Sequence, residues 1–390
     1  MKAGWKRKPL GSILSILNGY AFDAKAFSFE TGTPLIRIRD LKNGATTQTN
    51  FDGPYDQRYV VKAGGFLIGM DGEFGCFEWH GPDALLNQRV CKLHSFSAEI
   101  DPKFLFYGIN KHLKEIEDNT TFTTVKHLSS KQIAKIDFAF PPLDEQRRIV
   151  AVLDKAFAGI ATATANAQKN LTNARALFES YANDAFEELA LAAVKRPSLE
   201  TLTEAKSGIT YGVVKPGDIG SIPFVRGGDL IGGEVRLNRL RTITNEVSAQ
   251  YSRTLLRGGE LLMCLVGVPG QCAIAPAELA GANIARQVGL IRLKPDVNAE
   301  YVKDYLQSPP GQKSLGTYTG GSVQQVINLG DLRQVEIPLP ERSRQDEMVA
   351  RLAISKRLTR NLAQKIENKL TALIELKQSL LQKAFAGELT

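Results

Sequence analysis

Few stretches of the sequence have the residue types and spacing that catalysis needs. A loop that holds a target amine for methyl transfer has two prolines and then an aromatic residue. SPPG (308–311) lacks the aromatic residue, and PPLD (141–144) lies where a helix is expected to begin. The sequence has no Gly-x-x-x-x-Gly-Lys-Ser/Thr phosphate loop, and the glycine-rich GMDGEFG (69–75) is typical of a turn. EAK (204–206) resembles part of a nuclease motif, but its usual partner aspartate does not precede it. These patterns favour a chain without catalysis of its own.

Histidines and cysteines also lack the spacing of a metal or nucleophile site. All histidines lie in the first half of the chain: His80, His94, His112 and His127. A site shared by two similar halves would place histidines in both, so we interpret these as exposed or core residues. The cysteines show no Cys-x-x-Cys spacing, and we expect them to be reduced core residues rather than zinc ligands: Cys76, Cys91, Cys264 and Cys272.

Length and charge set the class of protein. A chain of 390 residues exceeds one ordinary domain. Lys and Arg number 49 against 41 Asp and Glu, and the pI is near 9.2. This balance suits a polyanionic partner, although an ordinary basic protein fits it equally well. The sequence shows neither a cleavable leader nor an apolar run approaching the ~20 residues of a membrane span, so we expect a cytoplasmic protein.

The sequence is a doublet. PPLDEQRRIV (141–150) and PERSRQDEMV (340–349) carry Pro, Gln and Val at the same spacing. PLIRIRDL (34–41) likewise resembles PFVRGGDL (223–230). Further matches follow in the same order along both halves, and they pair Leu10 with Leu199, Gly19 with Gly208, and Val90 with Val288. The period is far longer than that of solenoid repeats, so two duplicated domains are predicted.

Each copy combines a globular part with a long helix. Short β-branched runs and Gly-rich turns predict small strands, with short helices near 102–116 and 299–307. The predicted class is α+β, with two similar α/β globular domains joined by two long helices that form an antiparallel, pseudo-two-fold coiled coil. The expected boundaries are 1–142 and 196–339 for the domains, and 143–195 and 340–390 for the helical regions.

The long helices are predicted from apolar residues in alternating steps of three and four, the signature of a coiled-coil seam. The first stripe contains Leu153, Phe157, Ile160, Thr164, Ala167, Leu171, Ala174, Phe178, Tyr181 and Ala185. The second, less regular stripe contains Leu352, Leu358, Leu362, Ile366, Leu370, Leu373, Leu380 and Phe385. KAFAG occurs at 155–159 and 383–387, which antiparallel packing would bring to the same end, although alanine- and lysine-rich helices also repeat such words by chance.

Two similar but diverged globular domains, joined by a helical spacer, suit recognition of a DNA target that is split into two unlike halves. The chain resembles the specificity subunits of Type I restriction–modification systems over its whole length. The resemblance is carried by Gly4, Trp5, Leu10 and Gly11, by PLIRIRDL and PLDEQRRIVAVLD, by ANAQKNLTNARALFESY (165–181), and by LKQSLLQKAFAGEL (376–389).

That resemblance implies a subunit without catalysis of its own. Each globular domain would read one half of a bipartite DNA sequence, while the coiled coil fixes the spacer and docks two methyltransferase (modification) subunits. Restriction subunits would complete the assembly. The resemblance implies no cofactor on this chain, with S-adenosylmethionine, ATP and Mg²⁺ on the partner subunits.

Candidate site residues follow from how proteins contact DNA. Lys and Arg bind phosphates, while Arg, Asn and Gln read base edges. The candidates for DNA binding are Tyr20, Arg37, Arg39, Gln88, Arg89, Lys126, Tyr211, Arg226, Arg236, Arg286, Gln324 and Gln325. The candidates for partner binding, expected on the exposed first turns of the long helices, are Glu145, Gln146, Arg147, Arg148, Arg344 and Gln345. For each residue singly, a surface salt bridge or a helix-capping role is the competing interpretation.

The competing function is a coiled-coil scaffold for proteins that does not bind DNA by sequence. Such a scaffold accounts for the helices, but it leaves two diverged globular domains and the basic pI unexplained. A stand-alone enzyme would need a cofactor or metal site, which the motifs do not supply.

Overall fold

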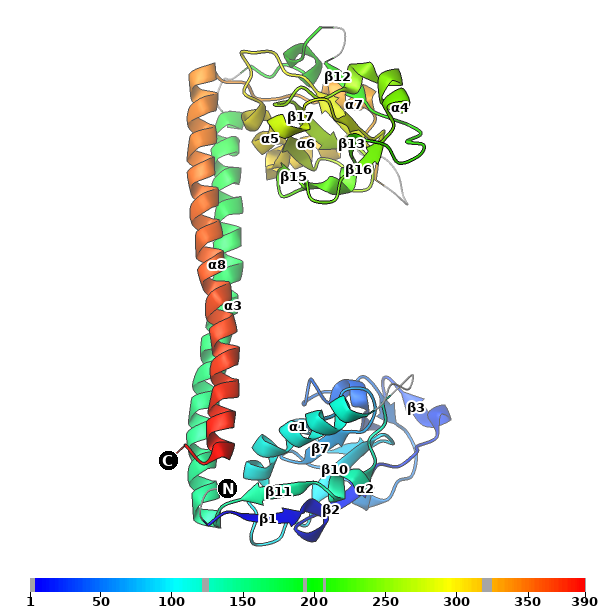
Figure 1. The fold of residues 1–390 in the computed structure, drawn as a ribbon, viewed down its shortest axis with the longest axis vertical. Helices are drawn as coiled ribbons and strands as arrows, with labels where there is room; N and C mark the ends of the chain where they lie inside the picture. The colour runs from blue at the N-terminus through cyan, green and yellow to red at the C-terminus, as the bar shows by residue number, and fades with distance from the viewer. Residues whose placement is uncertain (1–3, 121–125, 192–194, 206–207, 318–324, 390) are drawn as a thin grey trace. The chain divides into compact units, whose positions relative to one another are not determined.

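The computed structural model describes residues 4–120, 126–191, 195–205, 208–317 and 325–389. The chain forms two compact units, one of residues 1–166 with 369–390 and one of residues 167–368. Each unit holds a globular part and segments of two long helices, α3 (Leu143–Leu191) and α8 (Arg342–Ala386) (Figure 1). Two mixed helix-and-sheet domains with two long helices confirm the predicted fold class.

In the described part of the first unit, three sheets and two α-helices build the globular part. An antiparallel sheet has the order β2 (Ser15–Asn18), β10 (Val90–His94), β7 (Phe66–Gly69) and β8 (Gly75–Glu78). A second has the order β3 (Phe27–Ser28), β5 (Asn50–Phe51), β4 (Thr33–Ile36), β9 (Ala84–Leu86) and β6 (Val60–Val61). The third sheet has two strands, β1 (Lys6–Pro9) and β11 (Asp137–Phe140). The helices are α1 (Pro102–Asn119) and α2 (Ser130–Ala134).

The second unit repeats this plan. Its antiparallel sheet has the order β12 (Ile209–Tyr211), β20 (Val288–Ile291), β17 (Leu261–Cys264) and β18 (Cys272–Ile274). Its smaller sheets are β16 (Arg241–Ile243), β13 (Ile222–Val225) and β19 (Asn283–Ile284), and the pair β14 (Leu230–Ile231) and β15 (Glu234–Val235). The helices are α4 (Asn245–Gln250), α5 (Ala299–Gln307), α6 (Pro309–Gly316) and α7 (Leu329–Gln334).

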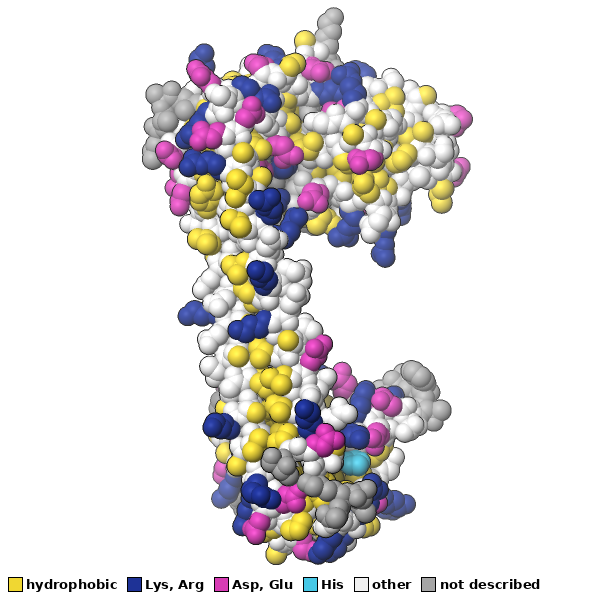
Figure 2. Space-filling model, turned by 60° about the vertical axis from the view of Figure 1, so that its left-hand side comes forward, with side chains coloured by type: hydrophobic (Ala, Val, Ile, Leu, Met, Phe, Trp, Pro, Cys, Tyr) yellow, Lys and Arg dark blue, Asp and Glu magenta, His cyan; other side chains and the backbone are white. Residues whose placement is uncertain are grey.

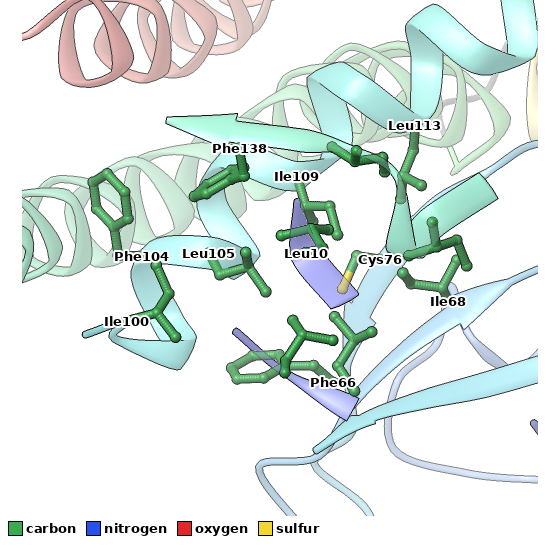
Figure 3. Packing of buried hydrophobic residues seen from close by; sticks show 14 of the residues in the cluster. Leu10, Phe66, Ile68, Cys76, Ile100, Phe104, Leu105, Ile109, Leu113 and Phe138 are labelled. Atoms are coloured by element: carbon green, nitrogen blue, oxygen red, sulfur yellow. The ribbon is translucent and has the colours of Figure 1, made fainter. Parts of the chain in front are cut away.

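Helix α1 shows how the sequence builds the core of the first unit. Its cap is Asp101, whose carboxylate accepts hydrogen bonds from the backbone N–H groups of Lys103 and Phe104 at 2.9 and 3.0 Å. Apolar residues at helical spacing then meet the sheet, with Phe104 and Ile109 among the fully buried ones (Figure 3). The N-terminal end of α1 is therefore fixed by its cap and its face by packing.

The cysteines lie in the cores as reduced thiols, as predicted. All four are free and buried. Burial raises the pKa of the Cys91 thiol to about 12 and raises that of Cys76 further. These thiols therefore stay protonated and serve as small core residues.

The long helices pack against each other within each unit. The first unit pairs the N-terminal part of α3 with the C-terminal part of α8, and the second unit pairs the remaining parts, so the helices are antiparallel. Both KAFAG stretches consequently lie in the first unit, where the Nζ of Lys377 lies 5.1 Å from the centre of the Phe157 ring. Leu153, Ala167 and Ala174 are buried along the α3 seam.

Three predicted seam residues were wrong. Leu358 and Leu362 are 61% and 47% exposed, and Tyr181 is 39% exposed. Between the buried Leu352 and Ile366, the heptad positions of α8 are Ser355, Thr359 and Ala363, and each of these is only half-exposed. Small residues therefore occupy the seam at this point. Leu358 and Leu362, which were predicted to lie in it, are exposed.

The expectation about apolar runs also needs correction. An 18-residue window of α3 within Leu143–Leu189 reaches a mean hydropathy of 1.2, enough by length and composition to cross a membrane. Helices of soluble proteins pass the same test, and one such helix is weak evidence for a membrane. Only 17% of the window is buried, so α3 exposes apolar surface.

Candidate nucleic-acid interface

One edge of the first antiparallel sheet gathers several of the predicted DNA-binding residues. The turn between β9 and β10 carries Gln88 and Arg89, and the backbone N–H of Gln88 donates to the Tyr20 carbonyl at 2.8 Å. Arg37 directly follows β4, whose last residue Ile36 accepts a hydrogen bond from the N–H of Asn87 at 3.3 Å. Three chain segments distant in sequence thus meet at this turn, because strand pairing holds their ends side by side.

A third connection brings in Lys126. The N–H of Met70 donates to the Arg89 carbonyl at 2.9 Å, and the N–H of Gly72 donates to the Lys126 carbonyl at 3.1 Å. Between these two bonds, Asp71 pairs with His127 in an antiparallel bridge. We call this group of loops, residues 19–22, 37–40, 70–72, 87–89 and 126–128, the first reading edge.

The second unit builds the same frame from different residues. The N–H of Arg286 donates to the Val213 carbonyl at 2.9 Å, and the N–H of Gly267 donates to the Gln325 carbonyl at 3.1 Å. Arg226 follows β13, whose last residue Val225 accepts from the N–H of Ala285 at 2.8 Å. Loops 211–214, 226–229, 265–267, 285–287 and 325–327 form the second reading edge. The predicted Gln324 lies outside the described residues.

Strand register corrects one predicted pair of equivalents. Leu10 and Leu199 match, since their N–H groups donate to the carbonyls of Ile136 and Val335. Tyr20 forms a parallel bridge with Asn87, and Val213 forms the same bridge with Ala285. Tyr20 therefore corresponds to Val213. Tyr211 lies two residues earlier, at the end of β12. The glycine equivalent to Gly19 is accordingly Gly212 and not Gly208.

Close backbone approach explains the glycine at that point. A Cβ on Gly19 would lie 2.0 Å from the carbonyl oxygen of Asn87, and one on Gly212 would lie 1.8 Å from that of Ile284. Only glycine fits where the end of β2 or β12 crosses this turn. The match to Gly208 failed because several glycines lie within a few residues of one another.

The two tyrosines are open to solvent. Tyr20 is 50% exposed, with its ring 5.1 Å from that of Phe22 and 5.2 Å from that of Tyr59. Tyr211 is 49% exposed. Both can therefore offer a ring face or a hydroxyl to a ligand.

Arg37 and Arg226, which follow β4 and β13, have the same structural role. The N–H groups of Arg37 and Arg226 donate to Asp40 and Asp229 at 3.0 and 2.8 Å, which caps the short turns Ile38–Asp40 and Gly227–Asp229. The guanidinium of Arg226 also donates to the buried Asp229 through Nε and Nη2, at 3.1 and 3.0 Å. Arg226 is thus partly committed to its own loop, as the salt-bridge interpretation supposed.

The remaining DNA-binding candidates differ in how free their side chains are. The Lys126 ammonium donates to the Glu117 carbonyl at 2.5 Å, so it is tied to the end of α1. Five others are exposed: Arg39, Gln88, Arg236, Arg286 and Gln325. Arg39 lies within the capped turn Ile38–Asp40, and Arg236 lies beside the turn Gly227–Asp229, where its N–H donates to the Asp229 carbonyl at 2.8 Å.

Arg89 combines an unusual backbone conformation with two side-chain contacts. Its φ of +70° is a left-handed conformation that non-glycine residues seldom adopt. Its Nε lies 3.5 Å from Asp71 and its Nη1 lies 3.3 Å from the Nδ1 of His127, while His127 lies 2.6 Å from Asp71. Sequence reasoning missed Asp71 and His127, since GMDGEFG looked like a bare turn and the histidine had no partner in the sequence.

The predicted partner-binding glutamines proved to be buried, and their expected place on the exposed first helical turn was wrong. The Gln146 Oε1 accepts from the Asp101 N–H at 2.8 Å, and its Nε2 donates to the carbonyls of Glu99 and Pro141 at 2.8 Å each. Gln345 repeats two of these bonds, with the Asn298 N–H at 2.8 Å and the Pro340 carbonyl at 2.9 Å. Each glutamine ties the start of a long helix to the cap of α1 or α5.

The other partner candidates lie on the surface of the first turns. Arg147 and Arg148 are exposed and Glu145 is half-buried. Arg344 is exposed and pairs with Glu347 at 2.6 Å.

An apolar stripe on α8 was not predicted as a surface. Ile354, Leu358 and Leu362 recur every four residues and are 51%, 61% and 47% exposed. Figure 2 shows apolar side chains exposed along the long helices. Large contiguous apolar patches on a protein surface mark interaction sites.

Comparison with known proteins gives a consistent result. The model of the Type I restriction modification DNA specificity domain matches residues 2–173. The chain is 32% identical to the Type I restriction enzyme EcoBI specificity subunit of Escherichia coli, over 99% of the chain and 86% of that protein. It is 24% identical to the EcoKI specificity subunit of Escherichia coli strain K12, over 99% and 89%.

Solved structures share the fold. A chain from a structure addressing complex assembly and conformational transition of the type I R-M system superposes with a TM-score of 0.69 at 18% identity, covering 99% of both chains. The HsdS subunit from Thermoanaerobacter tengcongensis superposes with a TM-score of 0.56 at 17% identity, covering 99% of this chain and 97% of that one.

Proposed function

We propose, because the chain belongs to the specificity subunits of type I restriction enzymes, that each of its two globular domains reads one half of a bipartite, asymmetric DNA target. The domains would span residues 1–142 and 196–339. The first and second reading edges would face the two half-sites.

One observation carries this proposal. The two reading edges share their backbone hydrogen bonds and the capping Arg–Asp pair, while the exposed side chains of the turns differ, Gln88 and Arg89 in one and Arg286 and Gln287 in the other. Duplicated enzymes would be expected to keep their chemical groups in both copies. Duplicated readers of an asymmetric sequence need the same platform with unlike residues.

Exposed residues on the edges suit contact with a duplex. Arg286, Gln88 and Gln325 can reach base edges or phosphates, and the tyrosine rings can pack against sugars or bases. A net charge of +8 favours the polyanion, and binding that depends on it should weaken as salt rises.

The helix pair would set the gap between half-sites and dock the modification subunits. α3 contains 49 residues, or ~74 Å of helix at 1.5 Å per residue, which is about twice the ~34 Å of one DNA turn. The apolar stripe of Ile354, Leu358 and Leu362 is the surface we assign to a modification subunit. Arg344 would supply an exposed charge on the same helix as this stripe, and Arg147 and Arg148 would supply exposed charges on the first turn of α3.

Catalysis and cofactors would belong to the partners. In this proposal the chain contributes no reacting group, while modification subunits hold S-adenosylmethionine and restriction subunits use ATP and Mg²⁺. The assembly would be cytoplasmic, where its DNA lies.

The experiment is to co-express the chain with a modification subunit from the same host and map methylated adenines across a plasmid. One asymmetric motif with two short halves around a fixed gap is the expected result. The scaffold alternative predicts protein complexes without sequence-dependent methylation. Failure to bind or methylate DNA, in a complex shown to assemble, would refute the proposal.

A further inference from the structure

The two reading edges differ most at one structurally equivalent place. The carbonyl of Arg89 accepts from Met70, as the carbonyl of Gln287 accepts from Leu265 at 2.8 Å. The bridge between Asp71 and His127 corresponds to the bridge between Val266 and Val326. A polar group of three side chains, Arg89, Asp71 and His127, is therefore replaced by a glutamine beside two valines in the second domain.

The backbone conformation and two neighbouring side chains constrain the Arg89 side chain. Left-handed backbone costs free energy for a residue with a side chain, and it persists where surrounding bonds fix it. Here the Arg89 carbonyl is bonded to Met70 and the turn is closed by the Val90 N–H to the Asn87 carbonyl at 3.3 Å. The Arg89 guanidinium lies 3.5 Å from Asp71 and 3.3 Å from the Nδ1 of His127, and the Arg89 side chain is still 55% exposed.

A guanidinium fixed in this way suits one base. Guanine offers two acceptors, O6 and N7, on its major-groove edge, which match two parallel N–H groups of arginine. Fixing the side chain beforehand lowers the entropy lost on binding, since fewer rotamers remain to be frozen.

The second domain offers a different reader at the same position. Gln287 is exposed, and an amide can both accept from N6 and donate to N7 of adenine. Val326 is 38% exposed, which provides apolar surface for a thymine methyl group. The anchors that would hold a charged group are absent among these equivalent residues, since valines stand in place of Asp71 and His127.

We infer that Arg89 selects a guanine in the half-site read by the first domain, and that Gln287 selects an A·T pair at the equivalent position of the other half-site. This inference rests on the proposed function and names the bases that two of its residues read. Asp71 and His127 act as positioning residues for Arg89.

The test uses the complete complex with its modification subunits and maps methylated sites for Arg89→Gln and Gln287→Arg. Arg89→Gln should reduce the preference for guanine at one position of one half-site by roughly 5- to 150-fold, the range for one bidentate contact. Gln287→Arg should remove the preference for A·T at one position of the other half-site. The gap length should stay the same in both variants.

A matched control separates reading from charge. Arg7→Gln removes the same charge from β1, where Arg7 pairs with Asp137 at 3.3 Å and lies outside the reading edge. It should leave the motif unchanged. Thermal unfolding of the three variants should match that of the unchanged chain, because all three side chains are exposed.

The outcomes are distinct. If the unchanged chain yields no bipartite motif, the proposed function fails. If it yields one, but Arg89→Gln keeps the same base preferences or lowers methylation equally at all sequences, Arg89 contacts phosphate or nothing, and the inference is overturned. An unaltered second half-site in Gln287→Arg would overturn the assignment of Gln287.

Discussion

Replacing Gln146 by leucine tests whether this residue is structural or a docking residue. The side chain is fully buried and makes three hydrogen bonds, to the Asp101 N–H and to the carbonyls of Glu99 and Pro141. Leucine has a similar volume and bonds to none of them. We therefore expect the variant to destabilise the contact between the start of α3 and the cap of α1.

The magnitude follows from the groups left without partners. A buried polar group without a partner costs about 1–3 kcal/mol. The Pro141 bond is buried, while those to Asp101 and Glu99 are partly buried and can be rehydrated in part. We expect a loss of about 3 kcal/mol from the free energy of local opening, which corresponds to roughly 150-fold faster hydrogen exchange.

Hydrogen exchange measured by mass spectrometry gives the readout in the free chain. Peptides from α1 should exchange faster in Gln146→Leu, while peptides from α5 provide an internal reference. Lys155→Leu is the matched control, because Lys155 is exposed on the same helix, has no assigned role in docking and receives the same new side chain. Equal exchange of α1 in the two variants, together with lost assembly in Gln146→Leu alone, would refute the structural role and restore the docking role.

Three further predictions address the long helices and the cores. Inserting seven residues at matched points of α3 and α8 adds ~10 Å to each helix, and methylation mapping should show the recognised gap growing by about three base pairs; an unchanged gap would contradict the spacer role. Leu358→Asp should weaken pull-down of a modification subunit at least tenfold, a loss of about 1.4 kcal/mol, with unchanged thermal unfolding, because Leu358 is 61% exposed. Because burial raises the pKa of Cys76 and Cys91, iodoacetamide at pH 8 should label them only after unfolding; rapid labelling of the native chain would show that they are not buried.

The helices and the duplicated plan were predictable because they depend on local periodicity. α3 begins at Leu143 as expected, and the short helices near 102–116 and 299–307 appear as α1 and α5. A heptad pattern indicates a seam without reference to distant residues. It misassigned Leu358 and Leu362 because leucine marks apolar character, while the seam at that level is filled by smaller side chains.

The reading edges were only partly predictable because their residues meet through strand pairing. Tyr20, Gln88, Arg89 and Lys126 were chosen by residue type, and backbone bonds bring them together. Asp71 and His127 lie 56 residues apart in the sequence, so no spacing pattern links them. Gln146 and Gln345 occupy the same position in the two halves because each is buried and bonded to backbone groups. Repetition in the sequence does not distinguish a buried structural residue from an exposed docking residue.

Repetition and divergence therefore have different physical meanings in this chain. Positions that repeat, such as Gln146 with Gln345 and Asp40 with Asp229, are buried and bonded to backbone groups, so the frame fails if they change. Positions that differ, such as Arg89 and Gln287, are exposed at the same point of that frame. A symmetric dimer of identical chains would present the same reader to both half-sites. Joining the two copies in one chain removes that constraint, and each reader can change without disturbing the frame that holds it.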